Sequence, residues 1–300
     1  MAKKIDWKGD INATVTPFRK DGSIDQEAYC DNMKRLLDEG IDGFIVCGAT
    51  GEPWSLSDEE TMLCFEMAKK TCPDTVTLIG GCSDILPQRV MEKAAFAQKA
   101  GLHGVMVMPP YYVMPSLNEV RAFYEYVAAN VKLPVLAYNN PEHQGFNMPP
   151  AFIAALANID GIVAVKQSSP NFMDVVELVR LAGDRLRIFA GLSIGRGFPA
   201  LTIGVDGFIS SSEPQVMGRE GVMLYDAYIS GDFEKAREVQ MKCLAVRKAL
   251  NSVGSFPSNL KGAMNLLGRN GGHMRPPFQD LNKEELEILR TELRAAGMPV

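Results

Sequence analysis

The sequence predicts an α/β fold, a (β/α)8 TIM barrel with a C-terminal helical extension. Two observations lead to this prediction. Short apolar segments rich in β-branched residues alternate with helical patterns eight times before residue 230. After Ser230 the chain shows helical patterns without strands. A doubly wound dinucleotide-binding sheet is disfavoured, because Thr16-Pro17-Phe18 follows the first strand in place of a GxGxxG motif.

The predicted strands are short runs of apolar, β-branched or aromatic residues. In chain order they cover Ile11–Val15, Phe44–Cys47, Val76–Ile79, Val105–Met108, Val135–Tyr138, Ile162–Val165, Arg187–Ala190 and Phe208–Ser210. The helical patterns between and after them cover Gln26–Glu39, Asp58–Lys70, Pro87–Lys99, Leu117–Asn130, Pro150–Ala157, Phe172–Ala182, Gly195–Ile203 and Gln215–Ile229. Ser57, followed by acidic residues, is a typical N-cap for the second helix.

The region beyond residue 229 has a different character. Helices are predicted at Asp232–Leu250, Ser258–Leu267 and Lys283–Ala296. We therefore expect residues 1–229 to form a catalytic barrel domain. Residues 230–300 would form a helical extension, packed on the barrel or on a partner subunit.

Composition excludes several classes of protein. The net charge is −5 with no basic block, which argues against nucleic-acid binding. No apolar run is long enough for a membrane span, and residues 1–6 lack the apolar core of a signal peptide. The six cysteines have no CxxC spacing, and Cys47 and Cys82 lie in apolar strands, so we expect reduced core thiols in a cytoplasmic protein. None of the three histidines lies near a cysteine, so a zinc site is not expected.

Lys166 stands at the end of the apolar strand Ile162–Val165, where a polar turn begins. Burying a lysine costs free energy unless it is paired or neutral, so this position calls for a reason. In one interpretation its stem lies along the core and its ammonium reaches solvent. In the other, desolvation favours a neutral amine that attacks a ketone and forms a Schiff base. The residues at the ends of the neighbouring strands distinguish between these two interpretations.

In such a barrel, residues at the C-terminal strand ends face one site. The second strand leads into Gly48–Glu52, whose backbone N–H groups and Thr50 hydroxyl suit a carboxylate. The fifth strand ends at Tyr138, whose hydroxyl either transfers a proton or is simply packed. Because Tyr138 and Lys166 end adjacent strands, their tips should approach each other. Together with the anion-binding turn they describe an imine-forming site for a 2-oxo acid.

These residues resemble the class I, Schiff-base aldolases and dehydratases grouped with dihydrodipicolinate synthase and N-acetylneuraminate lyase. The resemblance covers essentially the whole chain. It rests on motifs that stand in the family's order: Ala13–Phe18, Gly48–Glu52, Pro110-Tyr111-Tyr112, Tyr138-Asn139-x-Pro141, Val165-Lys166 and Gly204–Gly207. It implies a barrel lyase with no metal and no organic cofactor.

The resemblance also implies catalytic roles. Lys166 would form the Schiff base, and Tyr138 would be the proton-transferring hydroxyl. Tyr112 is similar to the tyrosine that family members offer across a subunit interface. This implies a homo-oligomer, either a dimer or a tetramer built from dimers, that acts on a small-molecule 2-oxo acid.

Substrate-binding roles follow from the same resemblance. In the turn that begins at Gly48, the Thr50 side chain with the amides of Ala49 and Thr50 would hold the substrate carboxylate. Ile209 would supply a backbone carbonyl near the imine.

Three departures from the family pattern bear on the substrate. The synthases carry a threonine that links two tyrosines in a proton relay, and here Ala49 has no hydrogen-bonding side chain. They also carry an arginine after the fifth strand, where this chain has Glu142-His143 and so lacks a guanidinium fork for a second carboxylate. Gly191–Ile194 lacks the acidic residues with which sialic acid lyases hold sugar hydroxyls.

We therefore expect a lyase, an aldolase or dehydratase, that forms a lysine Schiff base with pyruvate or a 2-keto-3-deoxy acid and makes or breaks a C–C or C–O bond. One alternative is dihydrodipicolinate synthase itself, which condenses pyruvate with aspartate semialdehyde, with His143 or a distant arginine replacing the missing fork. Another, from a different class, is a non-catalytic barrel that binds a 2-oxo acid.

Three further residues also attract attention. Arg275 is expected to pack the extension against the barrel. Trp54 follows the anion-binding turn and either lines the pocket or packs in the core. His103 lies in a turn at the opposite face of the barrel and is expected to be structural.

Overall fold

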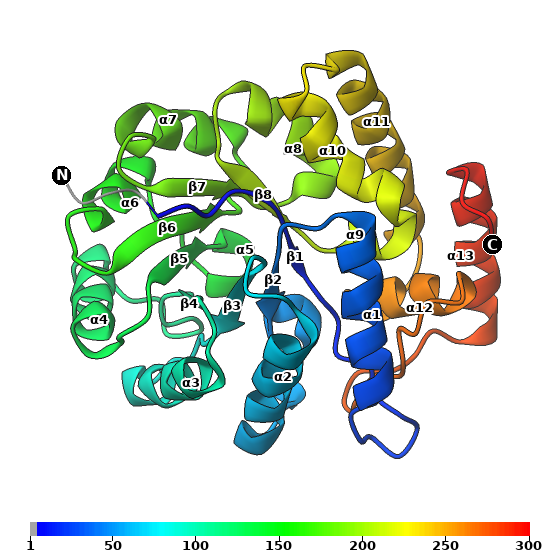
Figure 1. The fold of residues 1–300 in the computed structure, drawn as a ribbon, viewed down its shortest axis with the longest axis horizontal. Helices are drawn as coiled ribbons and strands as arrows, with labels where there is room; N and C mark the ends of the chain where they lie inside the picture. The colour runs from blue at the N-terminus through cyan, green and yellow to red at the C-terminus, as the bar shows by residue number, and fades with distance from the viewer. Residues whose placement is uncertain (1–4) are drawn as a thin grey trace.

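The computed structural model describes residues 5–300 and shows a closed barrel of parallel strands in the order β1 to β8, with β8 pairing back onto β1 (Figure 1). The strands are β1 (Gly9–Ala13), β2 (Gly43–Val46), β3 (Thr77–Gly81), β4 (Gly104–Val107), β5 (Val135–Asn139), β6 (Ile162–Gln167), β7 (Arg187–Ala190) and β8 (Gly207–Ser210). This confirms the predicted (β/α)8 barrel.

Helices follow the strands around the outside. They are α1 (Gln26–Glu39), α2 (Asp58–Thr71), α3 (Pro87–Ala100), α4 (Leu117–Asn130), α5 (Pro141–Gln144), α6 (Pro150–Leu156), α7 (Phe172–Ala182), α8 (Ser193–Thr202), α9 (Ser212–Met217) and α10 (Arg219–Ile229). Ser57 caps α2 as predicted, in a reciprocal hydrogen-bonded box with Glu60. Gly40 ends α1 in the left-handed conformation, at φ 101°.

The structure corrects several predicted boundaries. The single helix predicted at Gln215–Ile229 is two helices, α9 and α10, because Gly218 between them has φ 65° and ψ −140°. The helix predicted at Gly195–Ile203 begins earlier, at Ser193, and the strand predicted from Val76 begins at Thr77. The sequence did not predict the one-turn helix α5, or the 3-10 turns η1 (Ala49–Gly51) and η2 (Pro53–Ser55).

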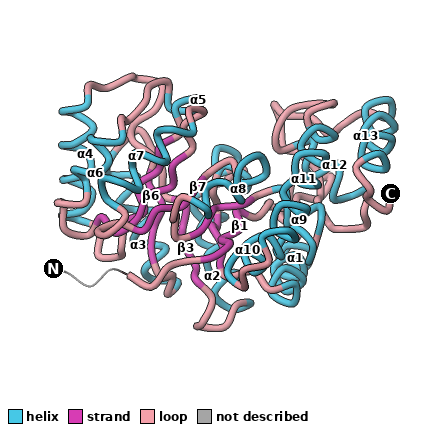
Figure 2. Tube along the Cα trace, turned by 90° about the horizontal axis from the view of Figure 1, so that it is seen from above, coloured by secondary structure: helices cyan, strands magenta, loops and turns pink. Residues whose placement is uncertain are grey.

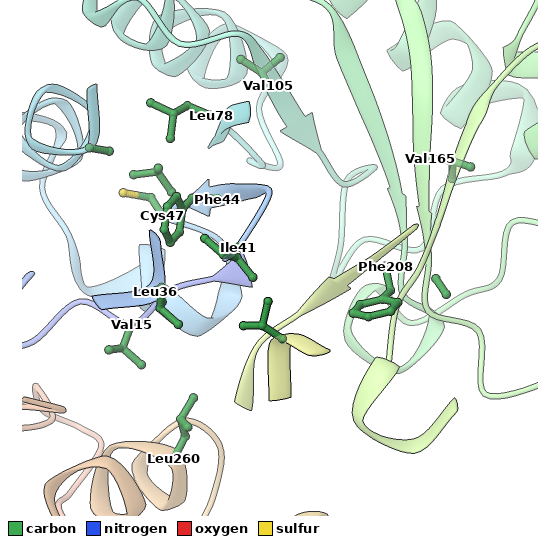
Figure 3. Packing of buried hydrophobic residues seen from close by; sticks show 14 of the residues in the cluster. Val15, Leu36, Ile41, Phe44, Cys47, Leu78, Val105, Val165, Phe208 and Leu260 are labelled. Carbon is green, nitrogen blue, oxygen red and sulfur yellow. The ribbon is translucent and has the colours of Figure 1, made fainter. Parts of the chain in front are cut away.

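The apolar core has two layers. The larger layer lies between the strands and the surrounding helices, and Figure 3 shows part of it, from Phe44 and Cys47 to Phe208. The smaller layer fills the barrel interior with alternate residues of the strands, among them Ile11, Ile45 and Leu136. The interior is therefore a packed core, and chemistry is confined to the mouth of the barrel.

The C-terminal part of the chain forms α11 (Phe233–Leu250), α12 (Ser258–Leu266) and α13 (Lys283–Ala295). These helices lie on one side of the barrel, beside α1, α9 and α10 (Figures 1 and 2). Leu260 of α12 and Leu289 of α13 belong to the same core layer as the barrel helices. The division into a barrel of residues 1–229 and an extension of residues 230–300 stays a prediction. Within residues 5–300, no helix combines the length and apolarity needed to cross a membrane.

Candidate active site

Lys166 and Tyr138 lie side by side at the mouth of the barrel. They are paired residues in the register of β5 and β6. Tyr138 belongs to the interior layer, and Lys166 follows the interior residue Ala164 by two positions, so both side chains point inward. The Lys166 Nζ lies 4.4 Å from the centroid of the Tyr138 ring. The predicted approach of the two side chains is confirmed.

The Tyr138 hydroxyl is held by a residue that the sequence analysis missed. Asn140 donates a hydrogen bond from its Nδ2 to the Tyr138 hydroxyl oxygen at 2.9 Å. The same nitrogen lies 3.0 Å from Nδ1 of His143. Asn140 lies two residues beyond Tyr138, so the two-residue period of β5 carries its side chain to the same face. That period was the signal in the sequence that could have found it.

On the outer face of the same strands, buried amides tie the ends of β5 and β6 together. Asn139 donates to Oε1 of Gln167 at 2.8 Å, and Gln144 of α5 donates to Oδ1 of Asn139 at 2.8 Å. The Met148 backbone N–H also donates to Oδ1 of Asn139. Because these amides are buried and bonded to each other, they fix the positions of the two strand ends. The strand ends in turn carry Tyr138 and Lys166.

The predicted anion-binding turn is the 3-10 turn η1, which begins after Gly48. The Gly51 and Glu52 backbone N–H groups donate to the carbonyls of Gly48 and Ala49, so these two donors are used within the turn. The first N–H groups of a helical turn, here those of Ala49 and Thr50, have no acceptor inside it. Thr50 is buried. The arrangement can present two amides and a hydroxyl to a carboxylate.

Glu52 closes this turn and forms a buried ion pair with Lys261 of α12, a contact the sequence analysis missed. Both side chains are almost fully buried, at 0% exposure for Glu52 and 2% for Lys261. Burial raises the pKa of Glu52, and the Lys261 ammonium opposes that rise. Burial likewise lowers the pKa of Lys261, against the attraction of Glu52. Lys261 also donates to the His273 carbonyl at 2.8 Å and lies over the Phe18 ring.

The remaining site candidates lie in different surroundings. Ile209 is in β8, paired with Ile11, and its side chain belongs to the interior layer. Tyr112 is 88% exposed, on a loop between β4 and α4, and has a left-handed φ of 73°. Val113 and Met114 beside it are also exposed.

Arg196 joins the loops that follow β6 and β7. Its guanidinium donates to the backbone carbonyls of Ser169, Pro170 and Gly191. Burial lowers the pKa of Arg196, and the nearby Arg247 contributes. Ser168 lies against Gly191, where an added Cβ would come within 1.8 Å of the Ser168 Oγ, so a larger residue there would require Ser168 to move.

The three residues set apart from the site have structural surroundings. Arg275 donates to Glu60 and to the Gly22 carbonyl, so it ties the end of the chain to the barrel as predicted. Trp54 is 51% exposed and lies against Phe278, which makes the core-packing interpretation wrong. His103 accepts a hydrogen bond on Nδ1 from the Leu78 backbone N–H, in agreement with a structural role.

The sequence matches the Dihydrodipicolinate synthetase family over residues 6–296. The chain belongs to this family. It is 33% identical to an uncharacterised DapA-like lyase of Rhizobium meliloti, over 99% of each chain. It is 30% identical to a 4-hydroxy-tetrahydrodipicolinate synthase of Methanocaldococcus jannaschii, over 97% of this chain and 99% of that one.

Solved structures agree with this membership of the dihydrodipicolinate synthetase family. A dihydrodipicolinate synthase from Thermotoga maritima matches with a TM-score of 0.91 and 29% identity, over 97% of this chain and 99% of that chain. The predicted family, fold and enzyme class are confirmed: the protein is a lyase of the dihydrodipicolinate synthetase family. This membership argues against the alternative of a non-catalytic binding barrel.

Proposed function

We propose that the protein is a class I lyase in which Lys166 forms a Schiff base with pyruvate or a 2-keto-3-deoxy acid. The observation that carries this proposal is the position of the Lys166 Nζ, 4.4 Å from the Tyr138 ring centroid at the mouth of the barrel. A half-buried lysine at an apolar strand end, beside the ring of a tyrosine, has the components for imine formation and proton transfer.

The reaction begins when the neutral amine of Lys166 attacks C2 of the 2-oxo acid. The new C–N bond gives a carbinolamine, whose oxygen leaves as water after it receives a proton from the Tyr138 hydroxyl. The Tyr138 phenolate then takes a proton from C3, and the electron pair moves toward the imine nitrogen. The resulting enamine either attacks an aldehyde carbon, whose oxygen takes the proton now on Tyr138, or expels the C4 hydroxyl, which leaves as water with that proton. Addition of water to the imine carbon then breaks the C–N bond and releases Lys166 and the 2-oxo product.

The substrate carboxylate would bind the turn that starts at Gly48, on the Thr50 hydroxyl and the amides of Ala49 and Thr50. Support comes from the internal bonds of Gly51 and Glu52, which leave those two amides as the donors at the start of η1. The Ile209 backbone carbonyl, on β8, would face the imine. These assignments follow the family resemblance at matching positions of this chain.

We also propose a homo-oligomer, a dimer or a tetramer, in which Tyr112 reaches across an interface toward the site of a second copy. Its 88% exposure beside exposed Val113 and Met114 supports this, because such an apolar surface is costly in a monomer. The left-handed backbone at Tyr112 and Met114 holds the loop in an unusual conformation. A cytoplasmic location is proposed from the buried, unpaired cysteines at positions 47, 64, 72, 82 and 243.

Dihydrodipicolinate synthase activity is the second candidate, favoured by relatives that carry the name 4-hydroxy-tetrahydrodipicolinate synthase. The residues at the mouth of the barrel favour this activity less than they favour a lyase that acts on a 2-keto-3-deoxy acid. Glu142 and His143 follow β5 in place of an arginine, and the guanidinium of Arg196 is engaged by three backbone carbonyls. Condensation of pyruvate with aspartate semialdehyde, measured with purified protein, decides between this candidate and a 2-keto-3-deoxy acid substrate.

The test of the proposed function is the intact mass of the protein after borohydride reduction in the presence of pyruvate. We expect a pyruvyl adduct on the wild-type chain and none on Lys166→Ala. If neither pyruvate nor a larger 2-oxo acid gives an adduct on the wild-type chain, the Schiff-base mechanism is wrong.

A further inference from the structure

Tyr138 has an unusual hydrogen-bond partner. Its side chain is 5% exposed, and the hydrogen bond to its hydroxyl comes from the Nδ2 of Asn140 at 2.9 Å. Ala49, in the turn after β2, has no side-chain donor or acceptor to offer. Asn140 is itself 6% exposed, so little water competes for this contact.

The one-turn helix α5 holds Asn140 in place. The Asn140 backbone N–H donates to Oε1 of Gln144 at 3.1 Å, and the side-chain Nδ2 lies 3.0 Å from Nδ1 of His143. The NH2 end of the Asn140 side chain faces both Tyr138 and His143. With the NH2 end at this position, one N–H reaches the tyrosine and the other reaches the histidine.

This orientation has a consequence for proton transfer. Because the Tyr138 oxygen accepts from Asn140, the hydroxyl proton is directed elsewhere and is available to a substrate. When that proton leaves, the Asn140 N–H remains on the oxygen and stabilises its negative charge. The Lys166 Nζ is near the ring centroid, at 4.4 Å, and no hydrogen bond joins it to the hydroxyl among the contacts of the described residues.

We propose that Asn140 is a positioning residue for Tyr138, doing what a hydroxyl at position 49 would otherwise do, and that His143 fixes the orientation of its amide. The proposal rests on the proposed function, since it needs Tyr138 to transfer the proton at C3. It also gives α5 a role in catalysis, because the loop after β5 would set the rate of proton transfer.

The experiment separates imine formation from proton transfer. Imine formation is measured as the end-point fraction of protein that borohydride traps with pyruvate. Proton transfer is measured as exchange of the pyruvate methyl protons for deuterium in D2O, followed by NMR. The variants are Asn140→Leu, which keeps the shape of the side chain, and Asn140→Asp, which keeps a polar group but removes the N–H. The matched control is Asn147→Leu, in the same loop, whose partner Asn139 keeps its bond to Gln167.

We expect the trapped fraction of both Asn140 variants to stay within about twofold of wild type. Their exchange rates should fall by at least about tenfold, which is less than the roughly 10²–10⁴-fold expected for loss of the proton-transfer group itself, because Tyr138 remains in the variants. His143→Ala should lower the exchange rate less than Asn140→Leu, and Asn147→Leu should leave both readouts near wild type.

Unchanged exchange in both Asn140 variants would overturn the proposal. Equal losses of trapping and exchange would also overturn it, because they would show a structural role only. Thermal melting curves identify a variant that fails to fold, in which case the other Asn140 variant carries the test. If the wild-type protein neither traps pyruvate nor exchanges its protons, the proposed function itself has failed, a result distinct from a failure of Asn140 alone.

Discussion

The buried pair Glu52–Lys261 gives a prediction about both stability and substrate binding. Removing one partner, as in Lys261→Met, leaves the Glu52 carboxylate buried without its counter-ion. Such a change typically costs about 3–5 kcal/mol of folding free energy. With an unfolding entropy of about 2.1 cal/mol/K per residue, this corresponds to a fall in Tm of roughly 5–8 °C for a chain of this length.

Calorimetry or circular dichroism measures this shift, and the double variant Glu52→Gln/Lys261→Met tests its cause. Replacing both charges removes the unpaired carboxylate, so the double variant should recover a large part of the lost stability. Lys248→Met is the control, because Lys248 is 82% exposed and its distance to Glu292 is 3.8 Å. The reasoning is refuted if Lys261→Met melts like the control, or if the double variant is less stable than the single one.

The same variant should weaken substrate binding. Glu52 closes the turn whose amides we assign to the substrate carboxylate, and its backbone has a left-handed φ of 57°. Without the Lys261 ammonium, burial of the Glu52 carboxylate becomes unfavourable. The carboxylate should then move toward solvent and alter the backbone conformation of the turn. KM for the 2-oxo acid should therefore rise by more than kcat falls. A fall in kcat at unchanged KM would place the effect elsewhere in the site.

Three further predictions address the chemistry, the assembly and the pH dependence. Tyr138→Phe should lower turnover by about 10²–10⁴-fold and slow imine formation, with pyruvate still trapped on Lys166 by borohydride at the end point, and a turnover near wild type would remove Tyr138 from the mechanism. Tyr112→Ala should shift the protein toward smaller species in sedimentation velocity, whereas an unchanged profile would argue against the interface at this loop. Burial raises the pKa of Asp10 in the folded state well above its ordinary value in the unfolded chain. The folded state therefore loses stability as the pH rises from the ordinary pKa toward the raised pKa. Asp10→Asn should therefore raise Tm more at pH 8 than at pH 5, and an equal effect at both would contradict the assignment.

Sequence reasoning predicted the parts of this molecule that depend on regular patterns. The barrel follows from alternating strand and helix periods, and the contact of Lys166 with Tyr138 follows from their places at the ends of adjacent strands. It erred where one residue interrupts a pattern. The periodicity from Gln215 to Ile229 is continuous enough for one helix, but Gly218 breaks the backbone at φ 65°. Hydrophobic periodicity carries no information about backbone handedness at a single glycine.

Sequence reasoning missed the Lys261 contact and the Asn140 contact for different physical reasons. Lys261 meets Glu52 because α12 packs against the barrel, and nothing in the local pattern of either residue shows that meeting. Asn140 precedes a helix of one turn, Pro141–Gln144, which is too short to show helical periodicity. Taken alone, the loss of a hydroxyl at Ala49 suggests a broken relay. The structure instead places an amide on the Tyr138 oxygen from the residue that follows the same strand, β5, so the absence of one expected side chain is a weak argument against catalysis when the tyrosine's own strand end can supply the hydrogen bond.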